Sequence, residues 1–344
     1  MDLAYVWFFI VGVLFVGYFV LEGFDFGVGM SLPFLGKDDI ARRQIINTIG
    51  PIWDLNETWI IVAGACLFAA FPEWYASMFS GFYLALLLIL LALIARGVSF
   101  EYRHQRESAQ WKRRFDRMII VGSAVPAFLW GVALANLVQG VPLNVDHDFT
   151  GSFLTLLNPY GLLGGLTTLL LFFTHGVSFV ALKTDGGVHR DARRLAVRSG
   201  LLTIAVAAVF LGWTVLNAAN AGAPLFLAAA GTAGLAAVLL IASVAAQLRE
   251  REGRSFAFGA GTVAFAVLTL WFALFPNVMP SNTDPAFSLT IDNASSTDYT
   301  LTIMTWAAVI FLPLVLAYQG WTYWVFRKRV TRARIERAAA APVH

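Results

Sequence analysis

The chain has 344 residues, of which 58% are apolar and 13% are charged, and its mean hydropathy is +0.71. Soluble globular proteins carry about 25% charged residues, so this composition excludes an ordinary water-soluble domain. In a bilayer, backbone polar groups must be satisfied within helices or a closed barrel. The apolar runs here are continuous over roughly 20 residues instead of alternating, which favours transmembrane helices over a barrel.

Nine apolar runs follow one another along the chain, and each is long enough to cross a hydrocarbon core of about 30 Å. The first contains Glu22 and Asp25 and has no basic region before it, so we expect a retained helix and not a signal peptide. The single cysteine, Cys66, excludes an intrachain disulfide. The sequence predicts one polytopic membrane domain with spans at about 5–32, 52–72, 76–95, 118–139, 159–182, 199–219, 223–246, 256–275 and 301–326.

The remaining segments are connections. The longest stretches predicted to be non-helical are 96–117, 140–158 and 276–300. A basic tail, 327–344, either extends the last helix or lies on the membrane surface as an amphipathic helix.

Positive charge is confined to alternate connections. All 24 Lys and Arg residues fall between runs 1 and 2, 3 and 4, 5 and 6, 7 and 8, or after run 9, whereas the other loops contain no Lys or Arg and instead hold acidic residues. The positive-inside rule therefore predicts an external N-terminus and a cytoplasmic C-terminus. Topogenic charge and anionic lipid also account for the net charge of +3, so no nucleic-acid partner is expected.

Four carboxylates lie inside or at the edge of the runs. Glu22 and Asp25 occur in LEGFDFGVG, and Asp54 and Glu57 in WDLNETW. Each pair has i, i+3 spacing and shares a helix face, and both pairs are predicted in the cytoplasmic half of the membrane. A charged side chain at mid-bilayer costs about 2.5–3.5 kcal/mol or more, so these acids are candidates for a proton uptake path. No Lys or Arg lies in any predicted run, so a counter-ion is expected from a loop or another subunit, or the acids hold protons.

Structural interpretations of these residues stay open. Asp54 is also suited to cap a helix or to complement its dipole from the first turn. His175 is the only histidine in a run, and a bis-histidine haem needs two, so we expect it to pack or to form a hydrogen bond. Gly23 and Gly27 form a GxxxG step typical of helix–helix contacts.

Several long motifs resemble subunit II of the cytochrome bd quinol oxidases. They are LEGFDFGVGM, RRQIINTIGPIWDLNETWIIVAGACLFAAFPEWYASMFSGFY, ARGVSFEYR, NLVQGVPLNVD, LLNPYGLLGG, FPNVMPSN and LTIMTWAAVIFLPLVLAYQGWTYW. The resemblance runs from about residue 5 to 327. It implies an all-α fold of nine helices, arranged as two four-helix bundles plus one extra helix, in the bacterial plasma membrane.

The resemblance also implies a division of labour. Subunit I carries the b- and d-type haems and oxidises quinol, whereas subunit II binds no haem and has no independent activity. Quinol, lipid, a structural quinone and a small single-helix accessory subunit are further expected partners. Together the subunits form an electrogenic quinol:oxygen oxidoreductase of the respiratory chain.

The family motifs assign proton delivery to two acids. Asp54 matches the acid of the WDxN motif, and Asp25 matches the second acid of the helix 1 motif. Leu55 replaces the usual glycine, and Glu22 is one methylene longer than the usual aspartate.

Two alternatives to an oxidase subunit stay open. One is a proton-coupled secondary transporter, although no inverted repeat is evident, and the other is a purely structural scaffold.

Overall fold

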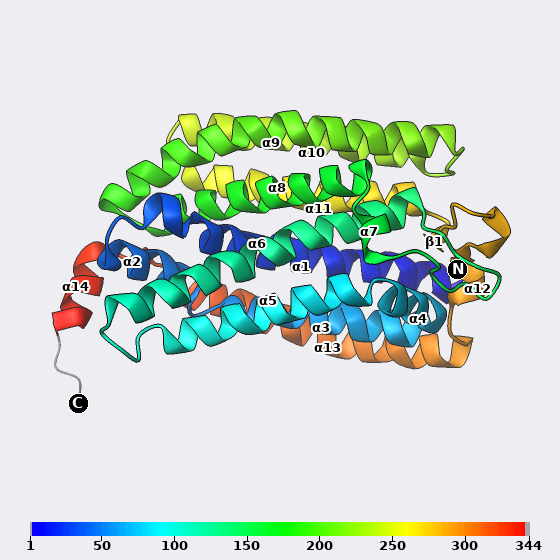
Figure 1. Ribbon diagram of the computed structural model, residues 1–344, viewed down its shortest axis with the longest axis horizontal. Coiled ribbons are helices and arrows are strands. Elements are labelled where there is room, and N and C mark those ends of the chain that lie inside the picture. The colour runs from blue at the N-terminus through cyan, green and yellow to red at the C-terminus, as the bar shows by residue number, and fades with distance from the viewer. Residues whose placement is uncertain (1, 341–344) are drawn as a thin grey trace.

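A computed structural model describes residues 2–340, with side chains from 2 to 337, and most of this part of the chain is helical (Figure 1). Long helices lie side by side, because each satisfies its own backbone hydrogen bonds and presents apolar side chains on all faces. The long helices are α1 (Leu3–Leu35), α3 (Trp53–Ala70), α5 (Tyr83–Tyr102), α6 (Ala109–Gln139), α8 (Pro159–Lys183), α9 (Gly186–Asn220), α10 (Phe226–Leu248), α11 (Glu252–Leu274) and α13 (Asp298–Val325).

Short elements occupy the connections. Strands β1 (Asn277–Met279) and β2 (Leu289–Thr290) pair antiparallel. The short helices are α2 (Asp39–Ile49), α4 (Pro72–Gly81), α7 (Phe153–Leu156), α12 (Ile291–Ala294), α14 (Arg332–Ala340) and the 3₁₀ turn η1 (Pro285–Phe287). The predicted non-helical stretches 140–158 and 276–300 therefore contain single turns of helix and one small hairpin, whereas much of 96–117 belongs to α5 and α6.

The helices fit an all-α membrane protein, as predicted. Within the described residues, eight are individually long and apolar enough to span a bilayer. The pair α2 and α3, bent by 44°, makes a ninth candidate when taken as one span. The arrangement as two bundles plus one helix, and the orientation in the membrane, stay predictions.

The third predicted span, 76–95, is wrong in its boundaries. Two helices replace it, since α4 ends at Gly81 and α5 begins at Tyr83. Gly81 packs against Phe149, and a Cβ at this glycine would lie 2.5 Å from the Phe149 Cβ. Because α5 continues to Tyr102, the first part of the predicted loop 96–117 is helical, and Arg96 lies inside a helix.

Helix α1 is the centre of the fold and contacts α3, α6, α8 and α11. The predicted helix–helix role of the GxxxG step is confirmed. A Cβ on Gly23 would lie 2.7 Å from the Phe172 ring, and a Cβ on Gly27 would lie 2.7 Å from the Gly176 Cα on α8. The two backbones approach closely because neither glycine carries a side chain.

The two ends of the molecule differ in their connections. Helices α2 and α14 and the α5–α6 turn lie at one end, called here the basic end, and the N-terminus, α4, α7, α12 and the strands lie at the other (Figure 1). The tail does not extend α13. It forms α14, which packs on α2 through buried Ile335 and an Arg332–Asp38 ion pair of 3.1 Å.

Candidate proton-transfer site

A buried arginine joins two of the predicted acids. Arg96 of α5 is fully buried and donates hydrogen bonds to Glu22 of α1 and, at 3.2 Å, to Glu57 of α3. The rings of Phe26 and Phe100 lie 4.9 and 5.3 Å from its guanidinium carbon. The expectation that no basic residue lies inside a span is therefore wrong. The hydropathy pattern ends the predicted span 76–95 just before Arg96, because a lone charge is unfavourable in lipid. In the fold, carboxylates from two other helices make the burial of this charge tolerable.

The remaining buried acid, Asp25, pairs with a neutral amide. Asn56 of α3 donates a hydrogen bond of 2.7 Å from Nδ2 to the Asp25 carboxylate of α1. Its Oδ1 accepts hydrogen bonds from Gln319 Nε2 at 3.0 Å and from Tyr323 Oη at 2.9 Å, both on α13. Asn56 thus connects the acid of α1 to α13 across α3.

Asp54 lies apart from this buried set. It occupies the first turn of α3 at the basic end with its side chain exposed, and the N-cap position belongs to Ile52, so Asp54 does not cap the helix. Its first-turn position agrees with the dipole interpretation. The exposure of the acids decreases from Asp54 inward. The Glu57 side chain is 22% exposed, and those of Glu22 and Asp25 are buried.

Five polar atoms around this set are buried without a hydrogen-bond partner in the described chain. They are Tyr18 Oη, Glu22 Oε2, Asp25 Oδ1, Arg96 Nε and Arg96 Nη2. Buried polar groups in native proteins are nearly always bonded, often by ordered water. The site therefore has unused capacity to bind polar molecules.

His175 has the expected packing role. It stacks on Phe256 with ring centroids 4.7 Å apart and an interplanar angle of 7°, and its Nε2 lies 3.3 Å from the Val20 carbonyl oxygen. A Cβ on Gly259 would lie 2.9 Å from its Nδ1, so protein encloses both ring nitrogens. Within residues 2–340, no three His, Cys, Asp or Glu side chains are arranged to hold a metal ion.

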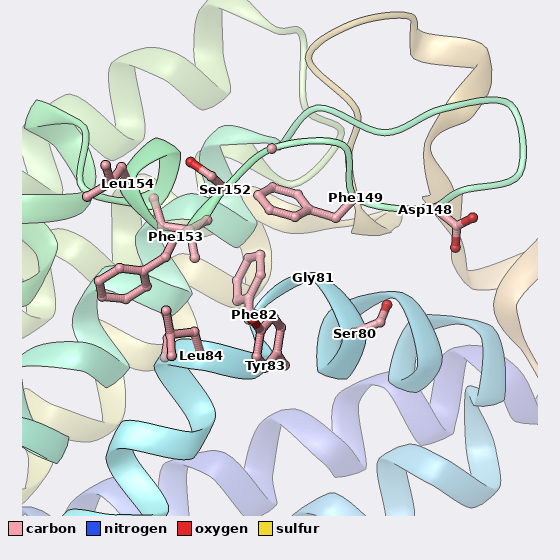
Figure 2. A pocket seen from close by; sticks show the side chains of 13 residues that line it. Ser80, Gly81, Phe82, Tyr83, Leu84, Asp148, Phe149, Ser152, Phe153 and Leu154 are labelled. Carbon is pink, nitrogen blue, oxygen red and sulfur yellow. The ribbon is translucent and has the colours of Figure 1, made fainter.

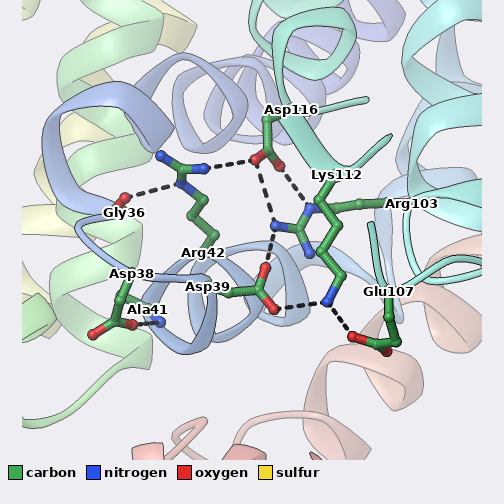
Figure 3. Close-up of polar contacts among 9 residues, drawn as sticks. All are labelled: Gly36, Asp38, Asp39, Ala41, Arg42, Arg103, Glu107, Lys112 and Asp116. Atoms are coloured by element: carbon green, nitrogen blue, oxygen red, sulfur yellow. Dashed lines mark hydrogen bonds and ion pairs between the residues drawn. The ribbon is translucent and has the colours of Figure 1, made fainter. Parts of the chain in front are cut away.

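A second polar cluster holds α2 at the basic end (Figure 3). Asp116 of α6 accepts hydrogen bonds from Arg42 at 3.0 Å and Arg103 at 2.6 Å. Asp39 of α2 accepts from Arg103 at 2.8 Å and Lys112 at 3.2 Å. Partial burial alone would raise the pKa of Asp39, but these hydrogen bonds and charges outweigh it, and its pKa lies below its ordinary value. The cluster fixes the segment that leads into α3 and Asp54.

Two hollows lie away from the acids. One, of about 710 Å³, is lined by Phe82, Tyr83, Phe149, Phe153 and Asp148, where the loop before α7 covers the α4–α5 break (Figure 2). The other, of about 470 Å³, is an apolar groove between α1, α3 and α13. It suits an apolar chain, and the structural quinone stays a prediction.

The sequence pattern missed Arg96, Asn56, Gln319 and Tyr323 as members of the site. The sequence holds a signal for two of them. Asn56 stands between the two acids of WDLNETW. Four acids in membrane spans also require a nearby cation, and Arg96, at the border of a predicted run, is the first candidate.

The chain is similar to known proteins over almost its whole length. Residues 3–326 match the family model of cytochrome bd terminal oxidase subunit II. The chain is 41% identical to cytochrome bd ubiquinol oxidase subunit 2 of Bacillus subtilis, covering 94% of this chain and 96% of the relative. It is 39% identical to cytochrome bd-I ubiquinol oxidase subunit 2 of Escherichia coli, covering 97% of each.

The fold is also that of a solved structure. A chain of the bd oxidase from Geobacillus thermodenitrificans superposes with a TM-score of 0.74 at 16% identity, over 95% of this chain and 99% of that one. At that identity the likeness supports the fold alone, whereas the family follows from the sequence matches. The chain belongs to the cytochrome bd terminal oxidase subunit II family.

Proposed function

We propose that this chain binds no haem and carries protons from the basic end toward the haem-bearing subunit I of a cytochrome bd-type quinol oxidase. The observation that carries the proposal is the graded set of acids: exposed Asp54, half-buried Glu57, and buried Glu22 and Asp25 around the single guanidinium of Arg96. The basic end, which holds the Lys- and Arg-rich connections, is then cytoplasmic by the positive-inside rule, with the N-terminus outside.

Charge balance explains how the site holds protons. One guanidinium neutralises one carboxylate, but Arg96 pairs with two, Glu22 and Glu57, and Asp25 next to them accepts only from the neutral amide of Asn56. A buried carboxyl group without a countercharge is more stable when it keeps its proton. Protons can therefore pass from Asp54 through Glu57 to Glu22 and Asp25, with ordered water bonding to the partnerless oxygen atoms. Arg96 holds the acids in place and limits the negative charge.

The exit leads toward α13. Asp25 is linked through Asn56 to Gln319 and Tyr323, and the outer face of α13 is largely exposed and apolar, with Trp306 and Ile310 exposed by 66% and 56%. An apolar face of this size needs lipid or protein against it, and we place subunit I there. The haems of that subunit would supply the electron chemistry, and each O2 reduced to two H2O consumes four electrons and four protons. The chain then acts as one polytopic domain within the complex, without activity of its own.

The proposal is tested with Asp25→Asn in the assembled oxidase. An asparagine can still accept the Asn56 hydrogen bond but cannot exchange a carboxyl proton, so haem content should be unchanged and quinol-driven oxygen consumption at least about tenfold lower. Asp298→Asn, at an exposed first-turn acid of α13 at the other end, is the matched control. Normal turnover in Asp25→Asn would favour the structural-scaffold alternative.

The absence of haem has its own test. The chain expressed without subunit I should reach the membrane with no haem absorption, and the co-expressed pair should show b- and d-type bands. A stoichiometric haem in the isolated chain would refute this part. Proton-coupled transport of a solute by the chain alone, without subunit I, would favour the transporter alternative.

A further inference from the structure

A cleft of about 520 Å³ opens between α9 and α10 at the basic end, and arginines dominate its lining. Arg190, Arg194 and Arg198 lie four residues apart on α9 and so share one helix face, and Arg193, three residues after Arg190, lies beside them. Like charges at this spacing repel each other. Holding four of them together is therefore unfavourable unless something anionic binds.

The protein itself neutralises only part of this charge. Arg193 pairs with Glu250 at 3.1 Å and lies 3.5 Å from Glu252. Among residues 2–340, Arg190, Arg194 and Arg198 form no ion pair with an acidic side chain of the chain. Glu250 also lines the cleft, so four guanidinium groups face a single carboxylate there.

A buried amide faces the same cleft without a partner. Gln247 of α10 lines the cleft and is only 2% exposed, and neither its Nε2 nor its Oε1 has a hydrogen-bond partner in the described chain. Leaving a buried polar group unpaired costs about 1–3 kcal/mol. A ligand that offers both an acceptor for Nε2 and a donor for Oε1 would remove this cost. A phosphate oxygen next to a hydroxyl group has this combination.

The position of the cleft favours a lipid over a free anion. Helix α9 has 35 residues, about 52 Å at 1.5 Å per residue, whereas the hydrocarbon core is about 30 Å thick. Its basic first turns therefore extend into the headgroup layer. Farther along α9 and α10 lies a second hollow of about 530 Å³, lined by apolar residues that include Ile204, Leu211 and Leu240. An acyl chain that runs along these two helices away from the arginines would reach the apolar hollow.

We propose that this cleft binds an anionic phospholipid. Its phosphate would lie against Arg194 and Arg198, a headgroup hydroxyl and a phosphate oxygen would pair with Gln247, and an acyl chain would fill the apolar hollow. Basic pockets between transmembrane helices at the cytoplasmic side are suited to acidic headgroups. The site is independent of the proton path, because none of its residues contacts the acids around Arg96.

The test uses the complex of both subunits, delipidated in detergent and titrated with dioleoyl phosphatidylglycerol or dioleoyl phosphatidylcholine under native mass spectrometry. The wild type should bind one phosphatidylglycerol at least about tenfold more tightly than phosphatidylcholine, since each arginine near a surface contributes about 1 kcal/mol toward an anionic lipid. Arg194→Gln/Arg198→Gln should lose this preference. Arg113→Gln/Arg114→Gln removes the same charge from exposed positions of α6 at the same end, and should keep it.

A charge-neutral variant keeps the test independent of assembly defects. Gln247→Leu removes both unpaired amide atoms at similar volume, and it should lower phosphatidylglycerol affinity at least about threefold while the complex stays intact. Unchanged preference for phosphatidylglycerol in Arg194→Gln/Arg198→Gln, or unchanged phosphatidylglycerol affinity in Gln247→Leu, would overturn the proposal. Saturable binding of inorganic phosphate as tight as that of phosphatidylglycerol would overturn it as well, since the site would then select a free anion.

Discussion

Arg96 of α5 and Glu22 of α1 form an ion pair in which neither side chain is exposed. The pair joins helices whose contacting residues are 74 positions apart in the chain, and Glu57 of α3 completes it from a third helix. A buried charge of this kind is stable only while its partners are present. The pair therefore makes assembly of the three helices depend on the acids that we assign to proton transfer.

Removing the guanidinium should destabilise the complex strongly. Arg96→Met keeps much of the side-chain length but leaves Glu22 and Glu57 without a countercharge, and breaking a buried pair costs about 3–5 kcal/mol. We expect a large fall in the yield and thermal stability of the assembled oxidase. Glu22→Gln/Arg96→Met, which removes both charges of the buried pair, should recover a substantial part of the loss. An Arg96→Met complex as stable as the wild type would show that the pair is dispensable.

Variants at the hydrogen bonds of Asn56 should destabilise the complex in proportion to the number of bonds that they remove. Tyr323→Phe removes one donor while Gln319 still serves Asn56 Oδ1, so the expected cost is about 1 kcal/mol. Asn56→Leu leaves Asp25, Gln319 and Tyr323 without this partner and should cost at least about 2 kcal/mol. Thermal unfolding of the purified complex in detergent ranks the two variants, and the reverse order would contradict the hydrogen-bond pattern.

The cluster around Asp39 predicts a pH dependence. The folded-state pKa of this acid lies below its unfolded value of about 3.9, so its contribution to stability is fully present above that value and is lost as the pH falls through the lower, folded pKa. Asp39→Asn should therefore lower the melting temperature of the complex at pH 7 more than at pH 3. Asp146→Asn, at an exposed loop position of the other end, is the control. A difference that grows on acidification would refute the assignment.

Reporter fusions test the orientation. Fusions after Lys183 or Arg327 should behave as cytoplasmic, because these segments are rich in Lys and Arg. Fusions near Asp146 or Asp284 should behave as external, because those loops contain no Lys or Arg. A single reversed loop would mean that the spans are miscounted.

Much of the fold follows from hydropathy alone. Continuous apolar runs predict helices because lipid leaves the backbone no other partner, and eight of the predicted runs coincide with long single helices, including α1, α6 and α13. The boundaries at α4 and α5 could not be read in this way. The break at Phe82 depends on Gly81 packing against Phe149 from a distant loop.

The sequence predicts the acids of the site but not the residues that bond to them. The four acids stand out because each is costly in an apolar run, but pattern alone gives no distances between helices. Hydropathy places Arg96 in a loop, because the burial of its charge is tolerable only through Glu22 and Glu57 on other helices. Gln319 and Tyr323 had no sequence signal at all, because their role comes from the contact between α13 and Asn56.

In the proposed route, Asp54 admits protons from the basic end to the buried acids. The most direct test is proton uptake from the cytoplasmic side during oxygen reduction by the Asp54→Asn complex, followed with a pH indicator in proteoliposomes. An asparagine cannot exchange a carboxyl proton, so we predict full haem content with uptake and turnover at least about tenfold slower, equal to about 1.4 kcal/mol on the limiting step. Asp54→Glu, which restores a carboxyl group, should recover part of the rate. Wild-type proton uptake in an Asp54→Asn complex with full haem content would show that Asp54 is not the entry point.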